Sequence, residues 1–388
     1  MALPLPKQFT KYFADNNPTE IKNLLITAEA VFESRTTNLN IAKNKVGNIT
    51  EKRETKPESN YRRLTRFFTI EEKRKMVKSL LCVACCCLDS KTRIKYLALD
   101  GTSWACGEKK IHLLTLSVVY SGVSIPIWWE ELGKKGTSNF KERKKVIREA
   151  CKFLNLKGLI LLADREYIGR AWFNYLKNKK LDFIIRLKEK AYKKEIDKPN
   201  VRKNDKKKIT PARYIKLQRM ALFQRYKNCG VSKQFKMSGN NYTFVIFKNP
   251  KKNAEENLIY FISSLKNKKE IIKAYPIRWT IESCFKHLKS NGFNLEEMNF
   301  KNPLKIMLMM AITVFLYVLC IVEGLTELKK SKPSDLKNYA NKKSFLAISV
   351  FSKGLSYLCL KFKNLTTFID YLNNKLLDKN LLFLQNVQ

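Results

Sequence analysis

Length, composition and charge already narrow the possible functions of this chain. Its 388 residues are enough for two or three domains, and 45% of them are hydrophobic, which is ample for a packed core. The 76 lysine and arginine residues outnumber the 34 acidic residues and give a formal net charge of +42. This excess indicates a polyanionic partner, most commonly nucleic acid, although genome base composition can also enrich lysine.

The ten cysteines do not indicate a secreted disulfide framework. The N-terminal segment MALPLPKQFTKYF lacks the apolar core of a signal peptide, so we expect a cytoplasmic protein whose thiols stay reduced. Four cysteines lie in LLCVACCCL, inside an apolar helical pattern: Cys82, Cys85, Cys86 and Cys87. Both histidines, His112 and His287, lie far away in the sequence, which favours buried helix thiols over a zinc site.

Residues 1–90 are predicted to form a helical N-terminal region. The segment PTEIKNLLITAEAVFESRT has apolar residues at helical spacing, and a basic segment follows it. Near the end of that basic segment, cations and aromatic residues are mixed: Arg62, Arg63, Arg66, Tyr61, Phe67 and Phe68. A basic helix with aromatic residues can bind DNA, and the alternative is a solvated helix face. We favour DNA binding, although no helix-turn-helix pattern identifies base-reading residues.

Residues 91–188 predict the first part of an α/β core. Three apolar runs with short turns between them predict antiparallel strands at KYLALDG, KIHLLTLSVVYSG and VSIPIWWEEL. Ser138 or Asn139 can cap the next helix, NFKERKKVIREACKFLN. A strand (GLILLAD), a helix (IGRAWFNYLKNKK) and another strand (LDFIIRLK) follow. This order is that of a ribonuclease H-like fold, in which the first and fourth strands are neighbours.

Two carboxylates follow apolar runs of this core. Asp100 ends the run YLALD, and Asp164 ends the run GLILLAD. Both runs have the length and composition of buried strands, so we expect each aspartate at the end of a strand. If the first and fourth strands are neighbours, the two aspartates come together.

Residues 189–265 separate this part of the core from a second part at 266–330. The gap is too long for a loop. It begins with a charge-rich stretch, and ARYIKLQRM, SKQFKMS, YTFVIFK and NLIYFISS then have the pattern of strands. We therefore expect a β-rich insertion subdomain that interrupts the core. Residues 331–388 are expected to form a helical, basic C-terminal region.

The apolar run from Ile306 to Val322 is either a membrane span or a core helix. Its length is at the short limit for crossing a bilayer. A helix that is apolar on all sides is a core helix in a large domain. We favour the core helix and expect no association with a membrane.

The stretch YPIRWTIESCFKHLK carries the most specific pattern of the chain. On a helix of about 100° per residue, an arc of roughly 60° holds Tyr275, Arg278, Glu282 and Lys289. The back of that helix is apolar and holds Ile277, Ile281, Cys284 and Leu288. Pro276 suits a first helical position, so the residue before it is expected just outside the helix. Spacing alone fits an amphipathic surface helix whose charges are solvated.

The pattern Y-x2-R-x3-E-x6-K in this stretch resembles the YREK signature of one family of DDE transposases, the insertion sequence four family of bacterial insertion sequences. Two further segments are similar to that family: DREY, which begins at Asp164, and WWEELGKKGTSNFKER, from Trp128 to Arg143. The resemblance covers roughly residues 60–355. It implies a ribonuclease H-like catalytic core with an inserted β subdomain, and DNA-binding helices before the core.

The resemblance also implies roles for single residues. Asp100, Asp164 and Glu282 would be the catalytic, metal-binding carboxylates, and the phosphates of the transposon end would be contacted by Tyr275, Arg278 and Lys289. Two Mg²⁺ ions about 3.5 to 4 Å apart, or Mn²⁺ in their place, can stabilise both the attacking and the leaving oxygen of a phosphodiester. The implied partners are double-stranded DNA, as transposon ends and as target, and a second copy of the chain in a synaptic homodimer. The implied location is the bacterial cytoplasm, at the nucleoid.

Several assignments keep alternatives. Asp100 by itself could be a turn acid, and Glu166 is a rival to Asp164, although it is off the strand end. Arg165 could pair with Glu166. Trp279 is either a core residue or a platform for a DNA base. For the whole chain, the rivals are a ribonuclease H-like nuclease that cuts without strand transfer and a non-catalytic DNA-binding relic of a transposase.

Overall fold

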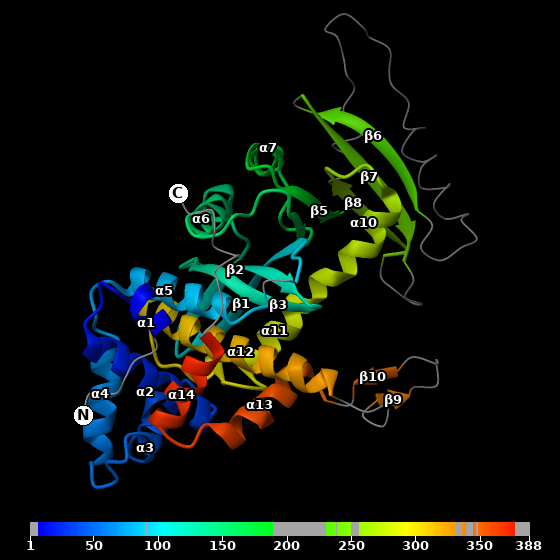
Figure 1. The fold of residues 1–388 in the computed structure, drawn as a ribbon. Helices are drawn as coiled ribbons and strands as arrows, with labels where there is room; N and C mark the ends of the chain where they lie inside the picture. Colours follow the sequence, from blue (N-terminus) through cyan, green and yellow to red (C-terminus); the bar gives the residue numbers. More distant parts are fainter. Residues whose placement is uncertain are drawn as a thin grey trace, which may run out of the picture.

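A mixed sheet of eight strands forms the centre of the computed structural model (Figure 1). The model describes residues 7–89, 92–134, 136–188, 230–237, 239–249, 256–330, 336–338, 344–346 and 348–376. The strands of this sheet are β1 (Tyr96–Cys106), β2 (Lys109–Tyr120), β3 (Val123–Glu131), β4 (Ile160–Ala163), β5 (Asp182–Leu187), β6 (Val231–Met237), β7 (Asn240–Lys248) and β8 (Leu258–Ser263). Their order across the sheet is β3-β2-β1-β4-β5-β8-β7-β6.

Helices precede the sheet, connect its strands and follow it. They are α1 (Lys7–Tyr12), α2 (Pro18–Ser34), α3 (Leu39–Ile49), α4 (Pro57–Phe67), α5 (Lys73–Cys86), α6 (Phe140–Ala150), α7 (Arg170–Asn178), α10 (Lys268–Ala274), α11 (Thr280–Lys289), α12 (Pro303–Lys329), α13 (Val350–Lys361) and α14 (Leu365–Leu376). Two short 3-10 turns are η1 (Tyr275–Trp279) and η2 (Leu295–Glu297), and a small hairpin is formed by β9 (Leu336–Asn338) and β10 (Ser344–Leu346). Among the described residues, the five helices α1 to α5 precede the first strand.

The first five strands have the predicted order, and the first three are antiparallel as predicted. β1 is antiparallel to β2, and β2 to β3, while β1 is parallel to β4, and β4 to β5. The first and fourth strands are therefore neighbours, as expected. The helix between β3 and β4 begins at an Asn139 cap, where Asn139 and Glu142 bond each other's backbone N–H groups in a capping box.

Alternating side chains divide the helices between the two faces of this sheet. Leu161 of β4 and Phe183 of β5 pack in the main core, which also includes the aromatic residues of α7. Their neighbours in the chain, Leu162 and Ile184, face the opposite side and pack in a second cluster with Ile271 of α10. Figure 1 shows α6 and α7 on one side of the sheet and α10 and α11 on the other. The period of two along each strand thus creates two separate layers.

The strands predicted for the insertion continue the central sheet. β8 pairs with β5 in antiparallel register, β7 pairs with β8, and β6 pairs with β7. They therefore cover the outer edge of β5, which would otherwise present unpaired N–H and C=O groups. The predicted strand ARYIKLQRM lies outside the described residues. The division of the chain into five regions stays a prediction.

Helix α12 carries the apolar run that could have been a membrane span. It has 27 residues, and 94% of its most apolar 18-residue stretch is buried inside the protein. Among the described helices, it alone is long and apolar enough to cross a membrane. Its partner α13 lies so close that a Cβ atom added to Gly354 would come within 1.8 Å of the Cys320 carbonyl oxygen. Burial on all sides is the environment expected of a core helix.

The cysteine cluster of α5 is part of the same packing. Cys85, Cys86 and Cys87 are buried, and burial raises the pKa of Cys82 to about 12. Within the described part of the chain, no group of three histidine, cysteine, aspartate or glutamate side chains could hold a metal ion as arranged here. The favoured interpretation of these residues as buried helix thiols agrees with this environment.

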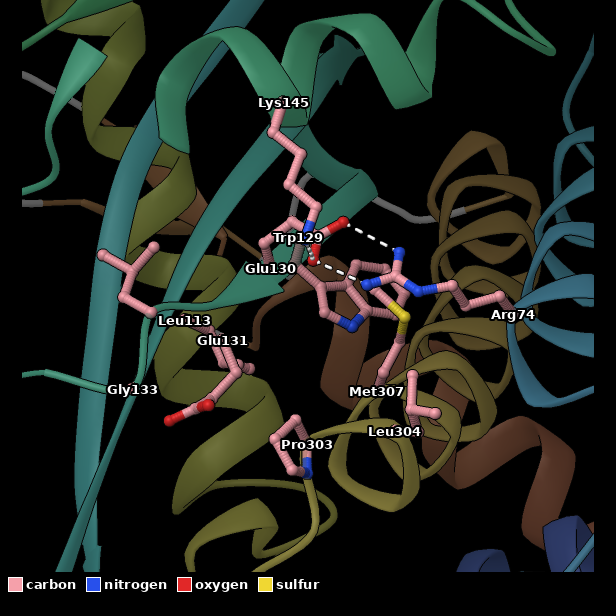
Figure 2. Close-up of a pocket in the computed structure, with 11 residues that line it drawn as sticks. Arg74, Leu113, Trp129, Glu130, Glu131, Gly133, Lys145, Pro303, Leu304 and Met307 are labelled. Carbon is pink, nitrogen blue, oxygen red and sulfur yellow. Dashed lines mark hydrogen bonds and ion pairs between the residues drawn. The ribbon is translucent and has the colours of Figure 1, made fainter. Parts of the chain in front are cut away.

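A buried carboxylate, Glu130 on β3, ties α5 and α6 to the sheet (Figure 2). Both of its oxygens accept hydrogen bonds of 2.9 Å from the Arg74 guanidinium, and Lys145 Nζ lies 2.9 Å from Oε2. Trp128 Nε1 donates a further hydrogen bond of 3.1 Å. Burial would raise the pKa of Glu130, but these donors and cations outweigh burial and hold the pKa below its usual value. The cavity of about 180 Å³ next to this cluster is lined by both Glu130 and Glu131.

Candidate active site

The two predicted aspartates lie in one row across β1 and β4. Parallel pairing of these strands runs to Leu99 and Ala163, so Asp100 and Asp164 are the next residues along both strands. The expectation that Asp100 ends its strand is wrong, because β1 continues to Cys106, paired with β2 throughout. Only the pairing with the short β4 stops at this point. Asp100 is thus held inside a strand, and Asp164 begins the turn that leaves β4.

The signature stretch does not form one regular helix. Helix α10 ends at Ala274, residues Tyr275–Trp279 form the 3-10 turn η1, and α11 begins at Thr280. Pro276 has no N–H to donate to a carbonyl four residues earlier, which accounts for the tighter turn at this point. A hydrogen bond of 2.6 Å between the hydroxyls of Thr280 and Ser124 then holds the start of α11 to β3.

This break turns the predicted polar face inward, onto the sheet. Tyr275 is 7% exposed and Arg278 6% exposed, so the picture of a solvated charged face is wrong for both residues. The Tyr275 ring packs on Phe261 of β8 with 4.5 Å between ring centroids. On α11, Ile281 and Phe285 pack on Ala98, which lies two residues before Asp100 and on the same face of β1.

Arg278 joins two of the three predicted catalytic carboxylates. Its Nη1 donates to Asp100 Oδ2 over 2.8 Å, and its Nη2 donates to Glu282 Oε1 over 2.7 Å. The Tyr275 hydroxyl lies 3.3 Å from Asp164 Oδ1. The signature residues from η1 and α11 therefore meet the aspartates from β1 and β4 at one place in the fold.

Negative charge is in excess at this place. Burial raises the pKa of Asp100 to about 6, against the opposing effects of Arg278 and of the Gly101 N–H, and both Glu282 and Asp164 add to the rise. Burial would lower the pKa of Arg278, but Tyr275 and the three carboxylates raise it above its usual value. One guanidinium thus faces three carboxyl groups and stays fully charged.

The other predicted contact residues lie farther from the carboxylates. Lys289 donates to the Ser103 carbonyl oxygen over 3.0 Å and forms an ion pair of 2.7 Å with Glu296, so it binds β1 beyond Asp100. Trp279 is 49% exposed, which removes the alternative that it is a core residue. The α4 arginines, Arg62, Arg63 and Arg66, are exposed, and α4 lies at the edge of the molecule away from α11 (Figure 1).

Two residues near Asp164 were missed in the sequence. Arg186 follows the β5 residue that pairs with Ala163, so it continues the row of Asp100 and Asp164 onto the next strand. Glu256, just before β8, forms ion pairs with both Arg186 and Arg165. Arg165, for which a pair with Glu166 was one alternative, thus pairs with Glu256 from a distant segment. The signal available in the sequence was Arg186 itself, a cation on β5 in register with Asp100 and Asp164.

The donor set suits a divalent cation. Three carboxyl groups from two parallel strands and a helix offer the oxygen ligands that Mg²⁺-like ions prefer. In the arrangement described, Arg278 lies between Asp100 and Glu282, and no three acidic, cysteine or histidine side chains of the described residues form a ready metal site. The residue types and the excess of negative charge fit such an ion, with the guanidinium as the present counter-charge.

Fold and site together define an α/β protein with an acidic centre formed by adjacent parallel strands and a facing helix. A family model described as a transposase DDE domain matches residues 91–319. This range is more than half of the chain, and the chain belongs to that family of DDE transposases. It contains all three carboxylates of the site.

Two further comparisons complete this picture. A search of curated proteins found no match. Among solved structures, the chain is similar to the piggyBac transposase in a cryo-EM structure of its synaptic complex with hairpin DNA, with 12% sequence identity and a TM-score of 0.47. The match covers 96% of this chain and 81% of that one.

Proposed function

We propose that this chain is a metal-dependent DNA transposase of the YREK, insertion sequence four type, with a ribonuclease H-like catalytic core. It would bind the terminal inverted repeats of a bacterial insertion sequence and cut and join DNA strands there. The observation that supports this best is the contact between the signature and the aspartates: Arg278 bonds Asp100 and Glu282, and Tyr275 bonds Asp164. Three residues of the proposed pattern, Tyr275, Arg278 and Glu282, thereby take part in hydrogen bonds at the two strand aspartates.

Asp100, Asp164 and Glu282 would hold divalent ions, Mg²⁺ by preference and Mn²⁺ as a substitute. When bound, such ions polarise a phosphodiester and lower the pKa of an attacking hydroxyl. The chain supplies the remaining requirements. Burial keeps Asp100 and Arg278 out of bulk water, where electrostatic interactions are weaker. Burial and the Asp164 charge raise the pKa of Tyr275, so its hydroxyl stays protonated and can donate a hydrogen bond to a carboxylate or a phosphate.

Double-stranded DNA is the proposed partner, both as transposon end and as target. The net charge of +42 favours a polyanion, and Lys289, Arg278 and Tyr275 would contact phosphates of the end. The exposed arginines of α4 would extend the contact to the N-terminal region. A homodimer in the synaptic complex and a location at the bacterial nucleoid stay predictions.

The test is a cleavage and strand-transfer assay. An end-labelled duplex that carries one terminus of the encoding element, mixed with an unlabelled target plasmid and Mg²⁺, should give cut ends and then joined products. Cutting without joining would favour the nuclease alternative. Binding without cutting in either Mg²⁺ or Mn²⁺ would favour the DNA-binding relic. Affinity that does not fall with salt would remove DNA as the partner, since each neutralised phosphate contributes about −0.9 to the log–log slope.

Trp279 is the proposed aromatic platform for a base at the end of the cut DNA. It is half exposed and adjacent to Arg278, and stacking of one base contributes about 1 to 3 kcal/mol. Trp279→Ala should permit nicking but slow the formation or resolution of a hairpin on the transposon end by about 5-fold or more. Denaturing gels of rapidly quenched samples separate the nicked, hairpin and fully cut species. Phe140→Ala, at an exposed aromatic residue of α6, is the control; equal slowing of every step in Trp279→Ala would contradict the platform role.

A further inference from the structure

Two guanidinium groups converge on one carboxylate beside Asp164. Arg165 Nη1 lies 2.8 Å from Glu256 Oε1, and Arg186 Nη2 lies 2.6 Å from Glu256 Oε2. Arg165 follows Asp164 in the chain, and Arg186 occupies the next position of the same row on β5. Each Arg therefore binds a different oxygen of Glu256, which comes from the segment that precedes β8.

This arrangement contributes little to stability. The three side chains are 41%, 25% and 36% exposed, and ion pairs at such positions contribute about 0 to 1 kcal/mol. The cluster of Arg165, Arg186 and Glu256 also has an excess of positive charge and, among the described residues, one N–H donor without an acceptor. Two cations share one carboxylate, and Arg186 Nε is buried without a hydrogen-bond partner in the part of the chain that the structure describes.

The geometry suits a phosphodiester group as well as a carboxylate. A phosphodiester shares one negative charge between two non-bridging oxygens, as a carboxylate shares its charge between two oxygens, and arginine binds both groups through paired N–H donors. Arg186 also lies close enough to Tyr275 for its charge to oppose the rise of the Tyr275 pKa, and the Tyr275 hydroxyl bonds Asp164. A phosphate bound by the two arginines would therefore lie next to the acidic centre, on the β5 side.

The position of Glu256 fits an occupant that can leave. Its backbone is held at the base of the β7–β8 connection, where Asn249 N donates to the Asn257 carbonyl over 2.9 Å and Asn249 Nδ2 donates to the Glu256 carbonyl over 2.9 Å. Among the residues that the structure describes, the two arginines hold the Glu256 side chain, and a rotation about its own bonds would free them.

We propose that Arg165 and Arg186 form a phosphodiester-binding site for the DNA backbone beside the catalytic centre, and that Glu256 occupies this site until DNA displaces it. This inference rests on the proposed function, because it takes DNA as the substrate. Glu256 then acts as an internal competitor, so that the DNA-free protein is partly inhibited. The exchange breaks two ion pairs with Glu256 and forms two with one phosphate.

The test compares DNA affinity among charge-matched variants. Glu256→Gln should raise the affinity for a short labelled duplex about threefold to tenfold, measured by fluorescence anisotropy. Glu270→Gln is the control, because it removes the same charge from the Lys95–Glu270 ion pair on α10, near the other end of β1. Arg165→Gln and Arg186→Gln should each lower the affinity and reduce the log–log salt slope by about 0.9. In the variant that lacks both arginines, Glu256→Gln should have no further effect.

The failures of the two proposals are distinguishable. If wild-type protein binds and cuts DNA but Glu256→Gln behaves as Glu270→Gln does, the competitor role is wrong and the proposed function stands. If Arg186→Lys retains the full affinity and salt slope, a bidentate phosphate contact at Arg186 is wrong. If no variant binds DNA, the proposed function itself fails. Thermal unfolding of each variant, expected within a few degrees of wild type, excludes misfolding as the cause.

Discussion

The Asp100 and Glu130 clusters use similar groups on the same sheet and differ in their balance of charge. Glu130 is one carboxylate with two cations (Figure 2), and the Trp128 indole is a further donor to it. The pKa of Glu130 lies below its usual value. At the Asp100 cluster, one guanidinium faces three carboxyl groups, and the pKa of Asp100 rises to about 6. Burial acts to raise the pKa of both acids, so burial alone does not decide the direction of the shift.

The difference separates a structural cluster from a binding centre. At Glu130, both carboxylate oxygens are bonded to cations of the protein, and the result is a tie between β3, α5 and α6. At Asp100, the protein holds negative charge that its own cation does not neutralise. Such an excess costs folding free energy, and it persists at sites where a ligand supplies the missing positive charge. The predictions below test that contrast.

The largest expected effect is on catalysis at the acidic centre. Asp100→Asn, Asp164→Asn and Glu282→Gln should each lower the rate of DNA cleavage by about 10³-fold or more, since each removes a charge that is proposed to hold the metal. Gel-shift affinity for the same duplex should stay nearly unchanged. Glu130→Gln should keep at least half of the wild-type rate. Near wild-type cleavage by any of the three acidic-centre variants would remove that residue from the assignment.

The second largest effect should be on stability, at the other cluster. Glu130→Gln should lower the free energy of unfolding by about 3 kcal/mol, because Arg74 and Lys145 lose their shared counter-ion. A loss of about 3 kcal/mol is the lower end of the range for breaking a buried ion pair, and we expect the lower end because both cations are partly exposed to solvent. Urea denaturation followed by tryptophan fluorescence measures it. Glu270→Gln, in an exposed pair, should change stability by less than about 1 kcal/mol; an equal loss in both variants would show that the Glu130 cluster is not special.

The two clusters should also respond to pH in opposite directions. The folded-state pKa of Asp100, about 6, lies above its ordinary value near 3.9, so its ionisation destabilises the folded protein as pH rises from about 4 to about 6. The pKa of Glu130 is lowered, so its contribution is present above about pH 4.3 and is lost as pH falls through the folded-state pKa.

Between pH 4 and pH 6, the wild-type protein should therefore lose unfolding free energy on the order of 2 kcal/mol through Asp100. The Asp100→Asn variant should not show this loss. Unfolding free energies of wild type and variant, measured across this range without divalent ions, give the difference curve. Asp370→Asn, in α14, is a control for removal of a carboxylate elsewhere. A difference curve that is flat between pH 4 and pH 6 would mean that the acidic centre is not overcharged.

Much of the acidic centre was predictable from the sequence, because it depends on local patterns. Asp100 and Asp164 each follow a buried apolar run, and the order of elements makes those runs parallel neighbours. Glu282 lies in a spaced pattern with an apolar back, and Ile281 is buried as that pattern requires. The family model matched over residues 91–319 spans Asp100, Asp164 and Glu282.

The rest depended on contacts that are distant in sequence. A uniform helix gives Arg278 a solvated position, whereas the 3-10 turn at Pro276 and the sheet beneath bury it. The strand of Asp100 continues past Gly101 because β2 is long enough to pair with it, which no local signal reveals. The contact of Arg186 with Glu256 requires the pairing of β5 with β8, across a segment of the chain that no local pattern spans.

The smallest expected effect is also the most direct measure of the missing positive charge. Ca²⁺, which takes oxygen ligands and does not need to support cleavage, should stabilise the wild-type protein through the acidic centre. At a Ca²⁺ concentration about ten times the dissociation constant, the gain in unfolding free energy is about 1.4 kcal/mol, which raises the melting temperature by a few degrees in a protein of this size.

Glu130→Gln should show the same rise in melting temperature with Ca²⁺, starting from a lower melting temperature, because its cluster has no unneutralised carboxylate. Asp100→Asn should lose it, because the variant removes one of the ligands. Differential scanning fluorimetry with and without Ca²⁺, at constant ionic strength, gives all three increments. An equal increment in wild type and Asp100→Asn would mean that the ion binds elsewhere, and that Arg278 already neutralises this centre.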